Sequence, residues 1–99
     1  MKIKIGWRKY KVIEKDDPEL DGEFVNGFID TDNLVIQLDK NLPKKTKQQV
    51  LIHEVVHGVL KNAGKQELFK NEELVDCIAS GIMQVIYDNE RNIFEKVGG

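Results

Sequence analysis

The sequence predicts an α+β fold in which a small, mainly antiparallel sheet of three strands packs on two helices. Two features of the residue pattern lead to this expectation. In the first forty residues, short segments rich in Ile, Val, Phe and Tyr alternate with turn residues, as in strands. After Pro43 the spacing of apolar residues changes from two to about 3.6, as in amphipathic helices.

Three strands are expected, at residues 3–13, 23–30 and 34–38. The first passes through Gly6 and ends at Asp16-Asp17-Pro18, because these residues favour a turn. Gly27 indicates a bulge in the second strand. Asp30-Thr31-Asp32-Asn33 predicts a tight turn before the third strand, since Leu34 stands where a calcium loop needs an oxygen ligand.

The first helix is expected to begin at Thr46 and to end at Asn62-Ala63-Gly64. Thr46 and Gln49 match a capping box, in which each side chain accepts a hydrogen bond from the other residue's backbone N–H. Apolar residues recur at helical spacing along this segment, at Ile52, Val55, Val56, Val59, Leu60 and Ala63. This stripe is wide enough to pack on the sheet.

A second helix is expected to begin near Asn71 and to extend as far as Phe94, before a frayed tail at Gly98-Gly99. Its apolar residues also recur at helical spacing, at Leu74, Val75, Ile78, Ala79, Ile82, Met83 and Ile86. Because the loop between the helices is short, the second helix returns against the first.

Composition limits the classes of protein to which the chain can belong. Lys and Arg total 15 and Asp and Glu total 17, a formal net charge of −2, which excludes a polybasic tail. The single cysteine, Cys77, has no internal partner, and we expect neither a signal peptide nor a membrane span of about 18 apolar residues. One cytoplasmic domain over residues 1–99 is therefore expected, without a membrane partner.

Both histidines of the chain lie in His53-Glu54-Val55-Val56-His57, inside the first expected helix. Four residues turn a helix by about 400°, so the two imidazoles lie one turn apart on one face and can reach one cation. Glu54 lies about 100° away, where it can take a proton from a metal-bound water rather than bind the metal. The motif predicts a site for one Zn²⁺ per chain.

A catalytic zinc site takes three protein ligands, so one more is needed. The chain has no third histidine, which leaves Cys77 or a carboxylate. On the second helix Glu72 and Asp76 share one stripe, whereas Cys77 lies about 140° round the axis from Glu72. We expect Glu72 to be the third ligand, Asp76 to accept the outer N–H of a ligand histidine, and Cys77 to be a small buried residue.

These motifs resemble those of known metallopeptidases. His53-Glu54-Val55-Val56-His57 followed by Asn71-Glu72-x-x-x-Asp76 resembles the gluzincin signature. The spacing Glu72-x-x-Val75-x-x-Ile78-Ala79 resembles the Glu-x-x-Ala-x-x-Phe-Ala element of ImmA/IrrE-like metallopeptidases, with Val75 in place of Ala. The layout of strands before the motif helix is similar to minigluzincins and to short phage or prophage proteins of that group.

The resemblance implies a minimal zincin-like half domain with one sheet edge along the cleft, able to pair with an extended peptide. It implies that His53, His57 and Glu72 bind zinc, that Glu54 is the general base, and that Asp76 supports a ligand. Larger gluzincins resemble one another in adding a His or Tyr that steadies the tetrahedral intermediate. This chain lacks that subdomain, and the substitutes it offers are Arg8, Tyr10, Tyr87 and Arg91.

Two functions follow as expectations. The first is a zinc metallopeptidase acting on a peptide or protein, with Glu54 as general base. The alternative is a zinc-stabilised binding or regulatory protein with little or no turnover, in which the metal contributes to folding. Losing one oxyanion donor can lower turnover by about 10²- to 10³-fold, so metal binding is the firmer expectation.

A third hypothesis concerns the basic first strand. Its basic and aromatic residues match a nucleic-acid contact stripe: Lys2, Lys4, Trp7, Arg8, Lys9, Tyr10 and Lys11. Lysines that protect an exposed edge strand explain the same residues without a ligand. The stretch 16–39 carries eight acids and neither Lys nor Arg, and it opposes a polyanion nearby. Nucleic acid is therefore the least favoured partner.

Overall fold

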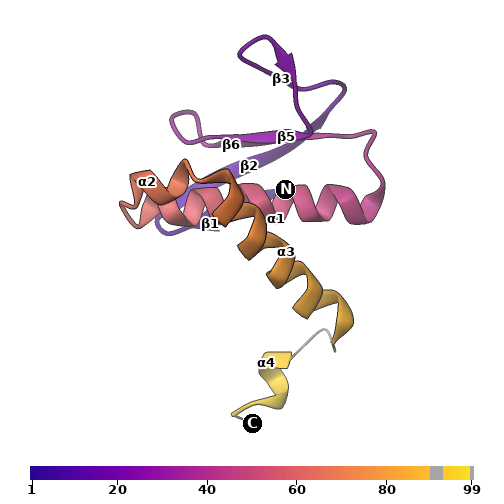
Figure 1. Ribbon diagram of the computed structural model, residues 1–99, viewed down its shortest axis with the longest axis vertical. Helices are drawn as coiled ribbons and strands as arrows, with labels where there is room; N and C mark the ends of the chain where they lie inside the picture. Colours follow the sequence, from indigo (N-terminus) through magenta and orange to yellow (C-terminus); the bar gives the residue numbers. More distant parts are fainter. Residues whose placement is uncertain (90–92, 99) are drawn as a thin grey trace.

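Figure 1 shows the computed structural model of the chain, in which residues 1–89 and 93–98 are described. In chain order the elements are β1 (Lys2–Ile5), β2 (Arg8–Lys15), β3 (Glu19–Leu20), β4 (Glu23–Phe24), β5 (Gly27–Asp30), β6 (Val35–Asp39), α1 (Lys44–Asn62), α2 (Gln66–Phe69), α3 (Glu72–Asp88) and α4 (Ile93–Lys96). The broad α+β class is confirmed.

The main sheet is mixed rather than mainly antiparallel. Its described strands follow the order β1-β2-β6-β5, so it has four strands where three were expected. β2 runs parallel to β6, while the β1–β2 and β5–β6 pairs are antiparallel. The expected single strand over 3–13 is wrong, because the chain reverses at Gly6, which has φ +62° and belongs to the turn between β1 and β2.

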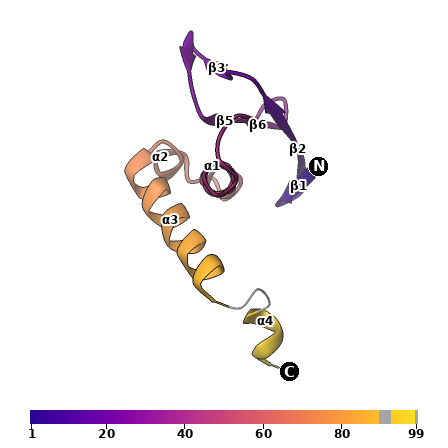
Figure 2. The same ribbon diagram turned by 90° about the vertical axis from the view of Figure 1, so that its right-hand side faces the viewer.

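The second expected strand, 23–30, is also divided. β4 pairs with β3 in a short ribbon that projects from the main sheet, and β5 joins the sheet beside β6 (Figure 2). Gly27 does not form a bulge, since it pairs in register with Leu38. A Cβ at Gly27 would lie 2.7 Å from Cγ1 of Val50 and 2.8 Å from the Gln37 carbonyl oxygen. The glycine therefore permits the close approach of α1 to β5.

The turn before β6 forms as expected. One carboxylate oxygen of Asp30 accepts hydrogen bonds from the backbone N–H groups of Asp32 and Asn33, at 3.0 and 2.9 Å. The other oxygen accepts from the Asn33 side-chain amide at 2.8 Å. These bonds to Asn33 and Asp32 hold the pKa of Asp30 below its usual value.

The ends of α1 agree only in part with the sequence. The helix begins at Lys44 after Pro43, so Thr46 lies inside it and the expected capping box is wrong. Pro43 lacks an N–H, and its carbonyl accepts the first helical hydrogen bond from Lys47 at 2.8 Å. At the other end Gly64 has φ +73°, the left-handed conformation that ends a helix, as expected.

α3 begins as predicted and ends earlier. The Asn71 side chain accepts a hydrogen bond from the backbone N–H three residues on, at 3.0 Å, and so caps the helix. The helix ends at Asp88, short of Phe94, which belongs to the separate helix α4. Residues 90–92, which the expected extension would cross, and Gly99 of the expected tail lie outside the described residues.

α1 lies between the sheet and α3 (Figure 2). Towards the sheet, α1 packs on a core of Ile5, Tyr10, Ile36 and Leu38. Towards α3, the buried contact consists of Val56, Val75 and Ala79. Thus α1 packs on the sheet and α3 packs on α1, which differs from two helices on one sheet face. Because α1 packs on the sheet on one side and on α3 on the other, the directions in which its other side chains point are fixed.

One side of α3 stays exposed. Val75, Ala79 and Met83 are buried, whereas Ile78 and Ile82 are exposed. Cys77 is also exposed, and the expectation that it is a small buried residue is wrong. Among the described residues the helix packs mainly on α1, with a smaller contact to α2, so one stripe of its wide apolar surface suffices for packing. In the part of the chain that the structure describes, no helix is long and apolar enough to cross a membrane.

Gly27→Ala is expected to destabilise the protein by about 1 to 3 kcal/mol, because the new Cβ would press on Val50 and on the Gln37 carbonyl. Urea unfolding of the metal-free protein measures the change. Gly81→Ala is the control: nothing lies within 4 Å of its added Cβ, and the better helix propensity should stabilise α3 by up to about 1 kcal/mol. Equal effects of the two substitutions would contradict the close approach of α1 to β5.

Candidate metal centre

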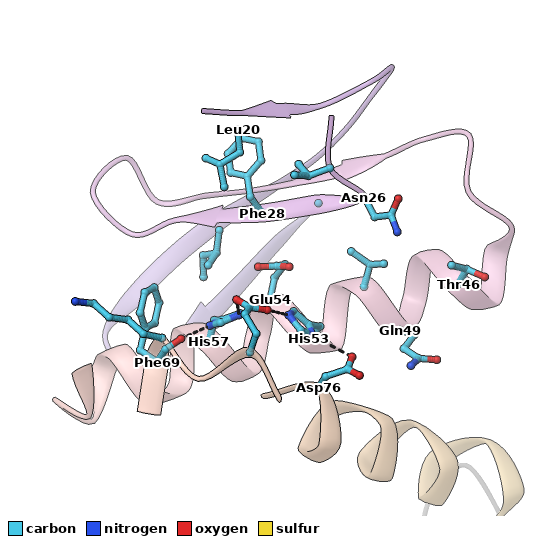
Figure 3. A pocket seen from close by; sticks show the side chains of 16 residues that line it. Leu20, Asn26, Phe28, Thr46, Gln49, His53, Glu54, His57, Phe69 and Asp76 are labelled. Carbon is cyan, nitrogen blue, oxygen red and sulfur yellow. Dashed lines mark hydrogen bonds and ion pairs between the residues drawn. The ribbon is translucent and has the colours of Figure 1, made fainter. Parts of the chain in front are cut away.

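A cleft of about 900 Å³ opens between β5, the β3–β4 ribbon and the helices α1 and α3 (Figure 3). Its apolar lining consists of Leu20, Val25, Gly27, Phe28, Ile29, Val50 and Phe69, and its polar lining consists of Asn26, Thr46, Gln49, His53, Glu54, His57, Lys70, Glu72 and Asp76. The apolar residues lie mainly towards the sheet. The charged residues gather where α1 faces the start of α3.

The two histidines and Glu72 converge at the floor of this cleft. His53 and His57 lie one turn apart on α1, with ring centroids 4.9 Å apart. The Nε2 atom of His53 lies 3.0 Å from Oε2 of Glu72, and Nε2 of His57 lies 2.9 Å from Oε1 of the same carboxylate. One ligand atom from each residue lies within 4.8 Å of the others. The structure therefore brings together the three residues that were expected to bind zinc.

The outer nitrogens of both rings face acceptors. Nδ1 of His57 lies 2.7 Å from the backbone carbonyl of Phe69, and a carbonyl can only accept, so Nδ1 carries the hydrogen. Nδ1 of His53 lies 3.5 Å from Oδ1 of Asp76, consistent with the supporting role expected for this carboxylate. Both Nε2 atoms face the Glu72 carboxylate, where a bound cation would lie between them. Sequence reasoning missed the Phe69 carbonyl, since any residue type at that position supplies one.

The donor set fits Zn²⁺. Two imidazole nitrogens and one carboxylate are a ligand set of catalytic zinc, which leaves a fourth position open. His57 is buried, whereas the Glu72 side chain is 71% exposed, so the site faces the cleft rather than the protein interior. The three donors converge, and the Nδ1 atom of each histidine faces an acceptor. This arrangement suits one bound cation.

Glu54 lies beside these donors but faces the sheet side of the cleft (Figure 3). It is 7% exposed. The pKa of its carboxyl is raised to about 7, because burial outweighs the opposing effect of His53 and the Glu72 charge adds to the rise. A buried carboxyl with a pKa near neutrality can both accept and release a proton at neutral pH. The expected separation of roles between Glu54 and the three donors agrees with this arrangement.

The other residues considered from the sequence lie elsewhere. Tyr10 is buried in the sheet core, and the guanidinium of Arg8 lies 4.8 Å from the ring centre of Trp7. The ring of Tyr87 lies 5.0 Å from Nζ of Lys45, near the end of α3. Arg91 falls outside the described residues. None of the described substitutes for an oxyanion donor therefore lines the cleft.

Comparison of the chain with protein-family models, with curated proteins and with solved structures finds no match to any of them. The interpretation of the cleft therefore rests on the geometry of its residues. Within the described part of the chain, one group of three His, Cys, Asp or Glu side chains has converging ligand atoms, and it is this one.

Glu72→Ala is expected to weaken zinc binding by more than about 100-fold, because it removes one of three converging donors, whereas residues that only support a ligand contribute about 10- to 100-fold. Competition with a chromophoric chelator measures the affinity. Glu73→Ala is the matched control, since it removes the same charge from the next, exposed position of α3. A larger loss in the Glu73 variant would reverse the assignment.

Glu54→Gln is expected to alter how the stability of the metal-free protein depends on pH. The carboxyl has a pKa of about 7 when folded and near 4.5 when unfolded, so its protonation favours folding below pH 4.5 and this contribution is lost as pH rises to about 7. The unfolding free energy of Glu54→Gln should therefore gain up to about 3 kcal/mol relative to wild type across this window. Urea unfolding with chelator present, and Glu73→Gln as control, tests this; parallel wild-type and Glu54→Gln profiles would contradict it.

Proposed function

We propose that the protein is a small zinc-dependent peptidase that hydrolyses peptide bonds in a peptide or protein. The observation that carries the proposal is the convergence of the His53 and His57 Nε2 atoms on the Glu72 carboxylate, beside the buried Glu54, in one open cleft. The motif spacing and its resemblance to gluzincins of the minigluzincin and ImmA/IrrE-like group add support. The ligands come from α1 and the start of α3.

His53, His57 and Glu72 hold the metal in this proposal, and Asp76 and the Phe69 carbonyl orient the two rings. Bound Zn²⁺ supplies Lewis acidity, which polarises a carbonyl group and lowers the pKa of a coordinated water. Glu54 takes the proton of the attacking water and transfers it to the leaving amine. Its buried position and raised pKa support this role, because the carboxyl changes protonation state near neutral pH.

The shape of the cleft supports an extended chain as substrate. β5 is an end strand of the main sheet, paired with β6 on one side, and its residues Gly27 to Ile29 line the cleft. An extended peptide can pair with such an edge through main-chain hydrogen bonds, while the apolar wall accepts alternate side chains. Figure 3 shows Phe28 of this strand on the opposite side of the cleft from the motif helix.

One observation favours the second candidate, a zinc-stabilised binding or regulatory protein with little turnover. Apart from His53 and His57, the described residues that line the cleft include no His, Tyr or Arg, and its remaining side-chain hydrogen donors are Asn26, Gln49, Thr46 and Lys70. Without a positioned oxyanion donor, turnover falls by about 10²- to 10³-fold. Zinc would then act by joining α3 to α1, which strengthens a small domain.

Glu54→Gln separates the two candidates. The amide cannot accept the proton, so cleavage of a denatured protein substrate should fall to background, while zinc content stays at one ion per chain. Glu73→Gln, which removes a charge outside the cleft, should cleave like wild type. Product analysis by mass spectrometry measures cleavage. If zinc-loaded wild type cuts no substrate, the peptidase proposal fails and the binding protein stands; equal cleavage by Glu54→Gln would remove Glu54 from the mechanism.

A further inference from the structure

Four lysines form one exposed patch on the face of the main sheet that points away from α1. The β1–β2 register places Lys2 opposite Lys11 and Lys4 opposite Lys9, and all four side chains are exposed. Like charges that lie directly opposite each other destabilise an antiparallel pair. Two such pairs in succession, about 7 Å apart along the strands, need an explanation other than folding. We call these four residues the lysine face.

Protection of a sheet edge does not explain the whole lysine face. β1 is an end strand, so Lys2 and Lys4 can guard it against pairing with another chain. β2 lies between β1 and β6, and its pairing with β6 begins at Lys11, so from that residue on it has no free edge. Lys11 therefore protects no edge, whereas Lys9 lies just before the stretch of β2 that pairs with β6. A ligand that bears several negative charges accounts for all four positions together.

Trp7 lies in the β1–β2 turn, two residues before Lys9. It is 75% exposed, although Trp is a residue that proteins usually bury. The Arg8 guanidinium lies 4.8 Å from the centre of its ring, where it restrains the ring and covers one side. Tyr10, the other aromatic of the stripe expected from the sequence, is 1% exposed and faces the core. One exposed aromatic thus lies in the turn that follows the Lys4–Lys9 pair.

The fold separates the lysine face from the acidic stretch that opposes it in the sequence. Asp16 follows the far end of β2, five residues and about 17 Å along the strand from Lys11, the nearest residue of the lysine face. Charges interact weakly beyond about 8 Å at physiological salt. The nearest acid by register is Asp30, which lies across Val35 from Lys11, about 10 Å away, and its oxygens already accept three hydrogen bonds. In the folded protein the acidic stretch therefore repels a polyanion at the lysine face less strongly than the sequence order indicates.

We propose that the lysine face and Trp7 bind single-stranded nucleic acid. The lysines neutralise successive phosphates, and one unpaired base stacks on the exposed side of the Trp7 ring. A duplex keeps its bases stacked on one another, so a single strand suits an exposed aromatic better. A membrane surface is the less favoured partner, because a single tryptophan offers little apolar area for insertion. This binding surface is separate from the metal centre and does not depend on the proposed peptidase activity.

Trp7 is the only tryptophan of the chain, so its fluorescence reports directly on the site. Titration of the full-length protein with oligothymidine should quench this fluorescence, because a base stacks on the ring. The logarithm of the binding constant should fall with the logarithm of salt concentration with a slope of about −3, as four phosphates at roughly 0.7 each require. Absence of binding at low salt, or a slope near zero, overturns the proposal.

Variants assign the binding to this surface. Lys4→Ala/Lys9→Ala should weaken binding roughly tenfold or more and reduce the slope by about 1.4, whereas Lys44→Ala/Lys65→Ala, with the same charge change, should leave the slope unchanged. In fluorescence anisotropy with labelled oligothymidine, Trp7→Ala should bind roughly 5- to 150-fold more weakly. Equal losses in the two lysine pairs overturn the assignment. Unquenched binding, or binding to phosphatidylserine vesicles without binding to oligothymidine, also overturns it.

Discussion

The contact between α1 and α3 is the constraint on which the candidate site depends. His53 and His57 come from one helix and Glu72 from the other, so their convergence exists only while the buried contact through Val56, Val75 and Ala79 holds. The sheet on the opposite side of α1 fixes the direction of that helix, and Gly27 allows the two to approach closely. The ligand geometry thus depends on two small apolar contacts of α1, one with the sheet and one with α3.

Electrostatics links this packing to the metal. The packing brings three carboxylates, those of Glu54, Glu72 and Asp76, to one cleft together with two histidines that are neutral when they act as ligands. Burial, opposed by His53 and assisted by the Glu72 charge, raises the pKa of Glu54, so the ionised form of this carboxyl is unfavourable in the cleft. In the proposed function a divalent cation would offset the negative charge of these carboxylates, so the residues whose donor atoms suit zinc would also favour it by charge.

Local spacing made part of this structure predictable. The four-residue interval of His53 and His57 and the cap at Asn71 depend on a single helix, and both formed as expected. Pairing between distant segments was not predictable: the parallel β2–β6 pair and the turn at Gly6 depend on long-range packing that a period of two residues does not encode. The prediction of a buried Cys77 was wrong for a related reason, because the apolar stripe of α3 is wider than its contact with α1 and some of its positions stay exposed.

The central claim is that two helices of this small α+β fold meet to hold one zinc ion. The most direct measurement is anomalous scattering at the zinc absorption edge from crystals of untagged, zinc-loaded protein. The account predicts a single peak about 2.0 to 2.2 Å from Nε2 of His53, Nε2 of His57 and a Glu72 carboxylate oxygen. A cleft without such a peak in zinc-loaded crystals, or a peak bound through Cys77, would contradict it.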